Sequence, residues 1–237
     1  MRLSLSELYE VLFSFYGPQN WWPIVENGTS LYLPEYMQRE RTPQEAIEIW
    51  TGAILTQNTA WKNVEKALVK LKARVPLSPE NLIKLPEEEI ADLIRPAGYY
   101  RQKAKKIHIS MRFLLENYGG NPCEIRRLSL PEARHQLLSL WGIGPETADS
   151  ILLYALGFPI FVIDAYTRRI LKLLGYPEAT QPYENLQALF HKSLAQDVGL
   201  YQEYHALFVT AGKTCRKKPD CGRCPLFSWC EKHHTRT

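Results

Sequence analysis

Residues 140–169 read LWGIGPETADSILLYALGFPIFVIDAYTRR, and the rest of the chain is interpreted from this stretch. Its turn contains Gly142 and Gly144, which let the backbone pass close to a partner. Pro145 stands where a helix begins, because a helix does not use the N–H of its first residue. The run 146–156 is apolar at helical spacing. The stretch therefore predicts a helix–hairpin–helix, which is either an anion site made of backbone N–H groups or a tight turn without a ligand.

Asp164 follows the apolar segment 161–163 and stands where a further helix begins. An aspartate in this place is most often only an N-cap. However, G-I-G-x-x-T-A followed at this separation by V-x-D-x-x-x-x-R resembles the helix–hairpin–helix glycosylases of the endonuclease III superfamily, and the resemblance covers most of the chain. It implies that Asp164 serves the chemistry and that the hairpin holds a DNA phosphate. The hairpin residues concerned are Gly142, Ile143, Gly144 and Thr147.

The composition is that of an ordinary globular protein. Of 237 residues, 45% are hydrophobic and 23% charged, and the net charge of +4 is compatible with nucleic acid without arguing for it alone. No apolar run reaches the length of a membrane span, and acidic residues interrupt the N-terminal apolar pattern, so we expect neither a membrane segment nor a signal peptide. The resemblance implies that the partner is double-stranded DNA containing a damaged base, and we expect a cytoplasmic, nucleoid-associated monomer.

Repeated helix-start signals predict an all-α fold. Thr42-Pro43 and Ser129-Leu130-Pro131 each combine a capping residue, a proline and an acid in the first turn. We expect two lobes: a helical-barrel domain of six helices with the hairpin over residues 43–160, and a terminal domain formed by residues 1–42 and 161–237. The resemblance implies an active site in the cleft between these lobes.

Aromatic residues cluster at two places before the hairpin. Trp21, Trp22 and Pro23 lie in a loop, where the two tryptophans either cover the core or form a wall on which a flat ligand stacks. Gln57 and Trp61 are spaced to share one helical face. A glutamine at such a helix end is often solvent-facing, whereas in the resembling family it fills the gap left by the nucleotide that leaves the stack. Lys103, Lys105 and Lys106 are interpreted either as phosphate contacts or as a solvated helix face.

Four cysteines near the C-terminus have the spacing C-x5-C-x2-C-x5-C. Four thiols so close together indicate a metal site rather than disulfides. Spacing alone suggests zinc first, and the resemblance implies a [4Fe–4S] cluster, although family members usually have six residues in the first gap. The basic residues between them, Arg223 among them, suit DNA phosphates. The expected ligands are Cys215, Cys221, Cys224 and Cys230.

Glu146 stands where bifunctional members of the resembling family have the lysine that forms a Schiff base. Since glutamate cannot form an imine, we expect a monofunctional glycosylase without AP-lyase activity by that route. An ionised Asp164 would stabilise the positive charge that develops on the sugar of a flipped-out nucleotide.

The remaining motifs concern the base. G-I-G-x-E-[ST]-A-D, Trp-Trp-Pro and Q-N-T-x-aromatic resemble the class III 3-methyladenine DNA glycosylases, which implies a base pocket lined by Trp21, Trp22, Pro23 and Trp61. A cationic alkylated purine is a good leaving group and gains from stacking on electron-rich rings. The best-known member of that group lacks the cysteine cluster. Two alternatives stay open: a glycosylase for mismatched, deaminated or oxidised-base pairs, such as thymine or uracil opposite guanine or adenine opposite oxidised guanine, and a non-catalytic lesion-binding protein.

Overall fold

The computed structural model describes residues 2–215 and 221–230. It confirms the all-α fold: the described part of the chain is mostly helical, with one two-stranded antiparallel ribbon of β1 (Ile24–Glu26) and β2 (Thr29–Leu31). The chain forms two compact units. We call Trp22–Phe158 the central unit, and the residues up to Trp21 together with those from Pro159 onward the terminal unit. No helix in the described residues is long and apolar enough to cross a membrane.

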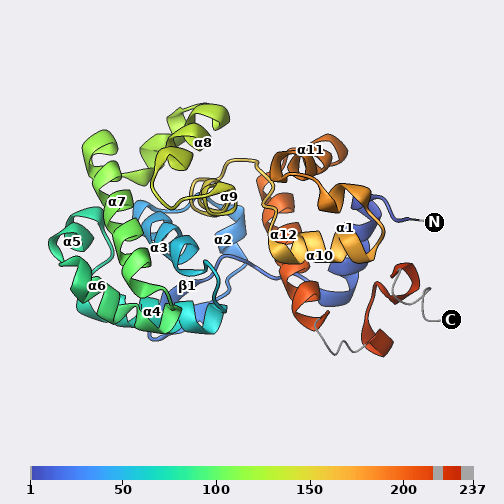
Figure 1. Cartoon of the computed structure of the whole chain (residues 1–237), viewed down its shortest axis with the longest axis horizontal. Helices are drawn as coiled ribbons and strands as arrows, with labels where there is room; N and C mark the ends of the chain where they lie inside the picture. Colours follow the sequence, from blue (N-terminus) through green and yellow to red (C-terminus); the bar gives the residue numbers. More distant parts are fainter. Residues whose placement is uncertain (1, 216–220, 231–237) are drawn as a thin grey trace. The chain divides into compact units, whose positions relative to one another are not determined.

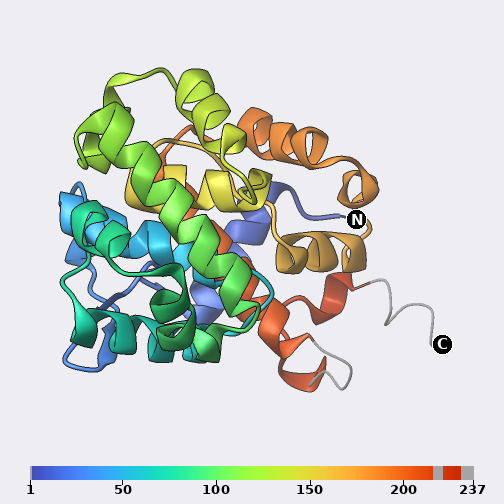
Figure 2. The same cartoon turned by 60° about the vertical axis from the view of Figure 1, so that its left-hand side comes forward.

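The central unit is built around α3 (Pro43–Leu55), in which every residue from Ala46 to Leu55 is buried. Thr42 begins α3 with a capping box, since its hydroxyl accepts from Glu45 N–H while the Glu45 carboxylate accepts from Thr42 N–H. α3 is packed against α4, α7, α9 and η3, and Figure 2 shows α7 crossing this unit as one uninterrupted helix. The other elements of the central unit are α2 (Glu35–Gln38), α4 (Trp61–Arg74), α5 (Pro79–Lys84), α6 (Glu87–Leu93), η1 (Arg95–Ala97), α7 (Tyr100–Tyr118), η2 (Pro122–Arg127), α8 (Leu130–Ser139), α9 (Pro145–Ser150) and the π-helical η3 (Ile151–Ala155).

Residues 22–42 belong to the central unit, whereas the sequence placed them with the termini. Side chains of α3 and α4 satisfy the backbone of the ribbon: Val25 N–H donates to Glu48 Oε1 at 2.6 Å, and Ser30 N–H donates to Glu65 Oε2 at 3.0 Å. Lys72 Nζ pairs with Glu48 Oε2 at 2.5 Å and so neutralises a carboxylate that burial penalises. These polar ties cannot be read from spacing along the chain.

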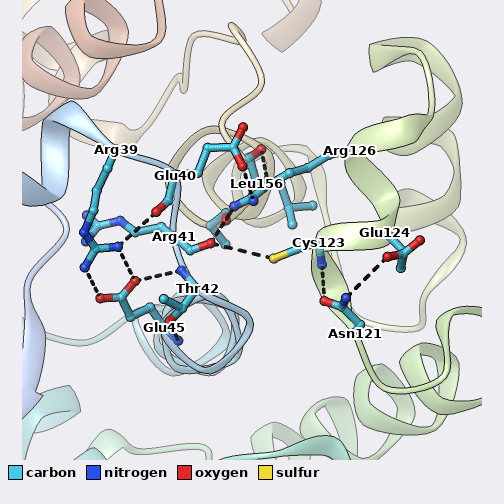
Figure 3. Close-up of polar contacts among 11 residues, drawn as sticks. Arg39, Glu40, Arg41, Thr42, Glu45, Asn121, Cys123, Glu124, Arg126 and Leu156 are labelled. Atoms are coloured by element: carbon cyan, nitrogen blue, oxygen red, sulfur yellow. Dashed lines mark hydrogen bonds and ion pairs between the residues drawn. The ribbon is translucent and has the colours of Figure 1, made fainter.

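Arg126 of η2 joins three segments of the central unit (Figure 3). Its guanidinium donates to the carbonyls of Arg41 at 2.9 Å and Leu156 at 3.2 Å, and pairs with Glu40 Oε2 at 2.8 Å. It thus satisfies carbonyls at the C-terminal end of η3, where the helix leaves them without N–H partners. Cys123, which the sequence analysis left out of the cluster, lies beside it with Sγ 3.7 Å from the Arg41 carbonyl.

The terminal unit places α12 (Val198–Thr214) between α1 (Leu5–Tyr16) and α10 (Ala165–Leu173), and Figure 1 shows these helices together. All residues from Tyr201 to Phe208 are buried. The Tyr204 ring is stacked on Phe208, with ring centroids 4.7 Å apart, and Phe161 is stacked on Phe190 at 3.8 Å. The remaining elements of this unit are η4 (Pro177–Thr180), α11 (Tyr183–Ser193), η5 (Cys221–Arg223) and η6 (Phe227–Trp229).

Candidate active site

The hairpin between α8 and α9 has the conformation that its two glycines predict. Gly142 has φ 79°, and the Lys106 side chain occupies the space that a Cβ there would need. Gly144 is the N-cap of α9 and is open, with no heavy atom within 4 Å of an ideal Cβ. Ile143 is 5% exposed and anchors the turn in the core, while its N–H donates to the Leu140 carbonyl at 3.1 Å. The turn therefore presents backbone at Gly144 and buries its one large side chain.

A buried ion pair fixes the two helices of the hairpin. Asp149 of α9 is fully buried, and its carboxylate accepts from Arg134 Nε at 2.7 Å and Nη2 at 3.2 Å. Such a two-point pair sets the direction as well as the distance between its partners. Asp149 was part of the recognised motif, but sequence reasoning gave it no role and did not consider Arg134, since the two residues belong to different helices.

Gln57 is tied to the hairpin. Its Nε2 donates to Thr147 Oγ1 at 2.9 Å and to the Gly142 carbonyl at 3.3 Å, while its Oε1 accepts from Lys106 Nζ at 2.5 Å. The structure thus brings together three of the residues predicted to contact DNA, Gln57, Gly142 and Thr147. It also adds Lys106, which the sequence analysis left between two interpretations.

The neighbouring lysines of α7 have different environments. Lys103 is 2% exposed and donates to the carbonyls of Leu55 at 2.9 Å and Ala97 at 2.8 Å, so it is not placed to contact a phosphate. Burial, helped by the charge of Lys106, lowers the pKa of Lys103 to about 8. Lys105 is exposed and lies over the Trp141 ring, 4.8 Å from its centroid.

Part of the predicted base pocket forms an aromatic cluster in the central unit. The Trp22 ring lies 5.4 Å from both the Trp61 ring, edge-on, and the Tyr154 ring. Gly52 gives Trp22 room, because a Cβ there would lie 3.1 Å from the indole ring. Trp61 Nε1 donates to Ser30 Oγ at 3.0 Å. At 3% exposure Trp22 backs the cluster, whereas Trp61 keeps part of its surface open.

The other two predicted pocket residues lie at the boundary between the units. Pro23 is buried next to Trp22 in the central unit. Trp21 is half-buried and is the last residue of the N-terminal segment of the terminal unit. The two adjacent tryptophans therefore differ in burial. Tyr154, a member of the cluster, was not singled out from the sequence.

Asp164 is the N-cap of α10, and its side chain is almost fully buried. Its Oδ1 accepts from the Thr167 N–H at 2.7 Å, and its Oδ2 lies 3.7 Å from Nε2 of His205 on α12. Burial by itself raises the pKa of this carboxyl, but His205 and the Thr167 hydrogen bonds outweigh burial and hold the pKa below its ordinary value of 3.8. Asp164 is therefore an ionised carboxylate in a place with little water.

Three residues of α11 hold the extended segment that leads to Asp164. Tyr183 Oη accepts from Ile163 N–H at 3.2 Å, Gln187 Nε2 donates to the Phe161 carbonyl at 2.6 Å, and His191 Nε2 accepts from Phe161 N–H at 3.0 Å. Residues 183, 187 and 191 are successive positions on one helical face. They give the segment the hydrogen bonds that a neighbouring strand would otherwise supply.

The sequence analysis made no claim for His191 and His205. A signal was present for His205, since it is a polar residue in the apolar run of α12 between Tyr204 and Phe208. Such a residue needs a partner when it is buried. The identity of that partner becomes visible only when α10 and α12 are packed together.

The four C-terminal cysteines end α12 and continue through η5 and η6. Cys215 is the C-cap of α12, and burial followed by the neighbouring thiols Cys224 and Cys230 raises its pKa. In residues 2–215 and 221–230, no group of three or more His, Cys, Asp or Glu side chains is arranged to hold a metal ion. Arg223 is exposed in η5, and Arg216, Lys217 and Lys218 lie outside the described residues.

Known proteins share the sequence of this site region. Residues 51–196 match the family model of the HhH-GPD superfamily base excision DNA repair proteins. The chain belongs to this superfamily. The Methanocaldococcus jannaschii protein named "Putative DNA repair glycosylase MJ1434" is 40% identical over 94% of this chain and 94% of its own length. The endonuclease III of Thermotoga maritima is 32% identical over 84% of this chain and 88% of its own.

Solved structures agree with this assignment. The Helicobacter pylori 3-methyladenine DNA glycosylase MagIII, bound to 1,N6-ethenoadenine, superposes with a TM-score of 0.70 at 25% identity, over 91% of this chain and all of that chain. A non-covalent endonuclease III–DNA complex gives 0.68 at 25% identity, over 84% of this chain and 88% of that one. A thermostable thymine-DNA glycosylase shares the fold at 0.70 and 19% identity, over 97% of this chain and 96% of that one. This chain is thus a DNA-binding base excision glycosylase of the helix–hairpin–helix type.

Proposed function

We propose that this glycosylase is monofunctional and removes alkylated purines, 3-methyladenine foremost. The observation that carries the proposal is the ionised, buried Asp164 in a chain whose α9 has Glu146 where bifunctional relatives have a lysine. A carboxylate can stabilise the oxocarbenium-like sugar and orient a water molecule. A carboxylate cannot form the imine that strand cleavage by that route requires.

The choice of base rests on the aromatic cluster. The partly exposed Trp61 is backed by the buried rings of Trp22 and Tyr154, and an accessible electron-rich ring of this kind attracts a cationic methylated purine. A neutral mismatched base would gain less from these rings. The Helicobacter pylori protein of the same fold is a 3-methyladenine glycosylase, which supports the same choice. The tied Gln57 and the hairpin around Gly142 are the residues that we propose to enter and grip the DNA.

The four cysteines fit a metal group by their donor chemistry, since four thiolates are the set that both a [4Fe–4S] cluster and structural zinc require. We propose the iron–sulfur cluster, with Cys215, Cys221, Cys224 and Cys230 as its ligands. When bound, the cluster supplies cross-links that hold the loop together. Within that loop the exposed Arg223 is the described side chain that we propose to contact a phosphate.

The proposed activity is tested by incubating methylated duplex DNA with excess protein and analysing the released bases and the strands separately. We expect free 3-methyladenine, strand breaks only after alkali, and no covalent adduct on borohydride treatment. Breaks without alkali together with a trapped adduct would show that another amine replaces the lysine. Release of thymine or uracil opposite guanine, without methylpurine release, would contradict the proposed substrate class, and binding without release of any base would support the lesion-binding alternative.

A further inference from the structure

The two carboxylate oxygens of Asp164 have partners from different helices. Oδ1 accepts from Thr167 N–H of α10 at 2.7 Å, which is all that an N-cap requires. Oδ2 lies 3.7 Å from Nε2 of His205 on α12. The side chains of Asp164 and His205 are only 10% and 8% exposed. The contact between Oδ2 and His205 adds nothing to the capping of α10. It therefore points to a second role of the Asp164 carboxylate.

His205 has a fixed position. It belongs to the buried run of α12, in which the adjacent Tyr204 stacks on Phe208 and donates from its hydroxyl to the Leu5 carbonyl at 2.8 Å. Since α10 and α12 are packed against each other, the buried imidazole is held close to Oδ2. An imidazole held in this way limits the orientations that the Asp164 carboxylate can adopt.

The charge matters because burial favours the neutral acid. Among the described residues, the interactions that oppose burial and lower the pKa of Asp164 come first from His205 on α12 and then from Thr167 on α10. Without His205, the carboxyl would keep only the Thr167 hydrogen bonds against the cost of burial. Its pKa would therefore rise.

We propose that His205 is a positioning residue for Asp164: its buried imidazole holds Oδ2 in place and favours the ionised carboxylate while positive charge develops on the deoxyribose. The inference rests on the proposed function of Asp164 and deepens it. His205 touches neither the base nor the sugar in this account. It acts through Asp164 alone.

The test compares Asp164→Asn, His205→Leu and His205→Gln in single-turnover release of 3-methyladenine from methylated duplex, with DNA affinity measured separately. At pH values below the raised pKa of Asp164, His205→Leu should lower the release rate about tenfold for each unit by which that pKa rises, and it should leave affinity unchanged. His205→Gln retains an N–H donor near the position of Nε2 and should recover part of the release rate. The acid limb of its pH–rate profile should still lie at higher pH than in the wild type. The matched control is His108→Gln, a buried histidine of α7 bonded to the Leu85 carbonyl at 2.8 Å, which should change neither quantity.

The outcomes separate the two proposals. If Asp164→Asn releases base like the wild type, the proposed role of Asp164 fails, and the role of His205 fails with it. If Asp164→Asn is inactive while the folded His205→Leu protein keeps the wild-type rate, only the positioning role is wrong. Should His205→Leu not fold, His205→Gln decides through its pH profile: an unshifted acid limb overturns the inference. In the double variant, His205→Leu should cause no loss beyond that of Asp164→Asn.

Discussion

Lys103 carries an amine in the core of the central unit, with two backbone carbonyls as its hydrogen-bond acceptors. A neutral amine has two N–H groups, which match the carbonyls of Leu55 and Ala97. The lowered pKa of Lys103 is consistent with an amine that loses its charge at little cost. Its structural task is to tie the end of α3 to η1, and this connects the base of the Gln57 loop to α7.

Lys103→Met keeps the length of the side chain and removes both donors. We expect a loss of about 1–3 kcal/mol in the free energy of unfolding by urea, because buried carbonyls lose their partner. Lys105→Met, at an exposed position of the same helix, should change stability by less than about 0.5 kcal/mol.

The same pair of variants gives a pH test. Since the pKa of Lys103 falls from 10.5 unfolded to about 8 folded, the unfolded chain binds more protons between these pH values, and stability contributed by this group rises with pH across that window. Lys103→Met should abolish that increase and Lys105→Met should keep it. Equal slopes in both variants would contradict the assignment.

At the scale of elements, α11 supports the extended segment that leads to Asp164, the proposed catalytic residue. Its side chains at positions 183, 187 and 191 satisfy the extended backbone that leads to Asp164. Gln187 is 7% exposed, and its bond to the Phe161 carbonyl, at 2.6 Å, is the shortest of the three. Because this segment has no paired strand, its order depends on α11.

Gln187→Leu retains the packing volume and removes the donor. We expect faster amide hydrogen exchange in a peptide covering residues 160–164, by the equivalent of about 1–3 kcal/mol, together with slower base release. Lys192→Met, an exposed substitution on the same helix, is the control and should leave exchange unchanged. If exchange in residues 160–164 is the same in both variants, α11 does not hold the segment.

Elements could be predicted where their signals are local. The capping boxes at Thr42 and Ser129 begin helices as expected, since each box involves residues within one turn. The run after Gly144 was predicted as one helix, but the structure changes to a π-helical segment at Ile151, which the apolar spacing does not distinguish. Asp197 begins α12 in the same local way, because its side chain accepts from Leu200 N–H at 2.7 Å.

Contacts between distant residues could not be predicted in the same way. The hairpin glycines and Asp164 were identified because their motif is contiguous. His205 and Arg134 were missed, because each gains its meaning from a partner on another helix. Residues 22–42 group with the central unit and not with the termini for the same reason, since their ties to Glu48 and Glu65 depend on packing.

At the scale of the whole molecule, the question is which metal group the four C-terminal cysteines hold. The core of the terminal unit is supplied by aromatic packing around α12, and the four cysteines follow that helix rather than enter this core. A metal group there would stabilise the loop and its exposed Arg223, while the fold around Asp164 would stand without it.

The metal content of protein purified without oxygen decides between the two groups that fit. A [4Fe–4S] cluster requires about four iron and four acid-labile sulfide per chain, whereas zinc requires about one metal ion and no sulfide. We expect iron and sulfide, and their loss in Cys221→Ser and Cys224→Ser. Cys123→Ser, which removes the thiol beside the Arg41 carbonyl in the central unit, should keep the full content. Zinc without sulfide would contradict the [4Fe–4S] proposal and support a structural zinc site. A metal content unchanged by Cys221→Ser would contradict the ligand assignment.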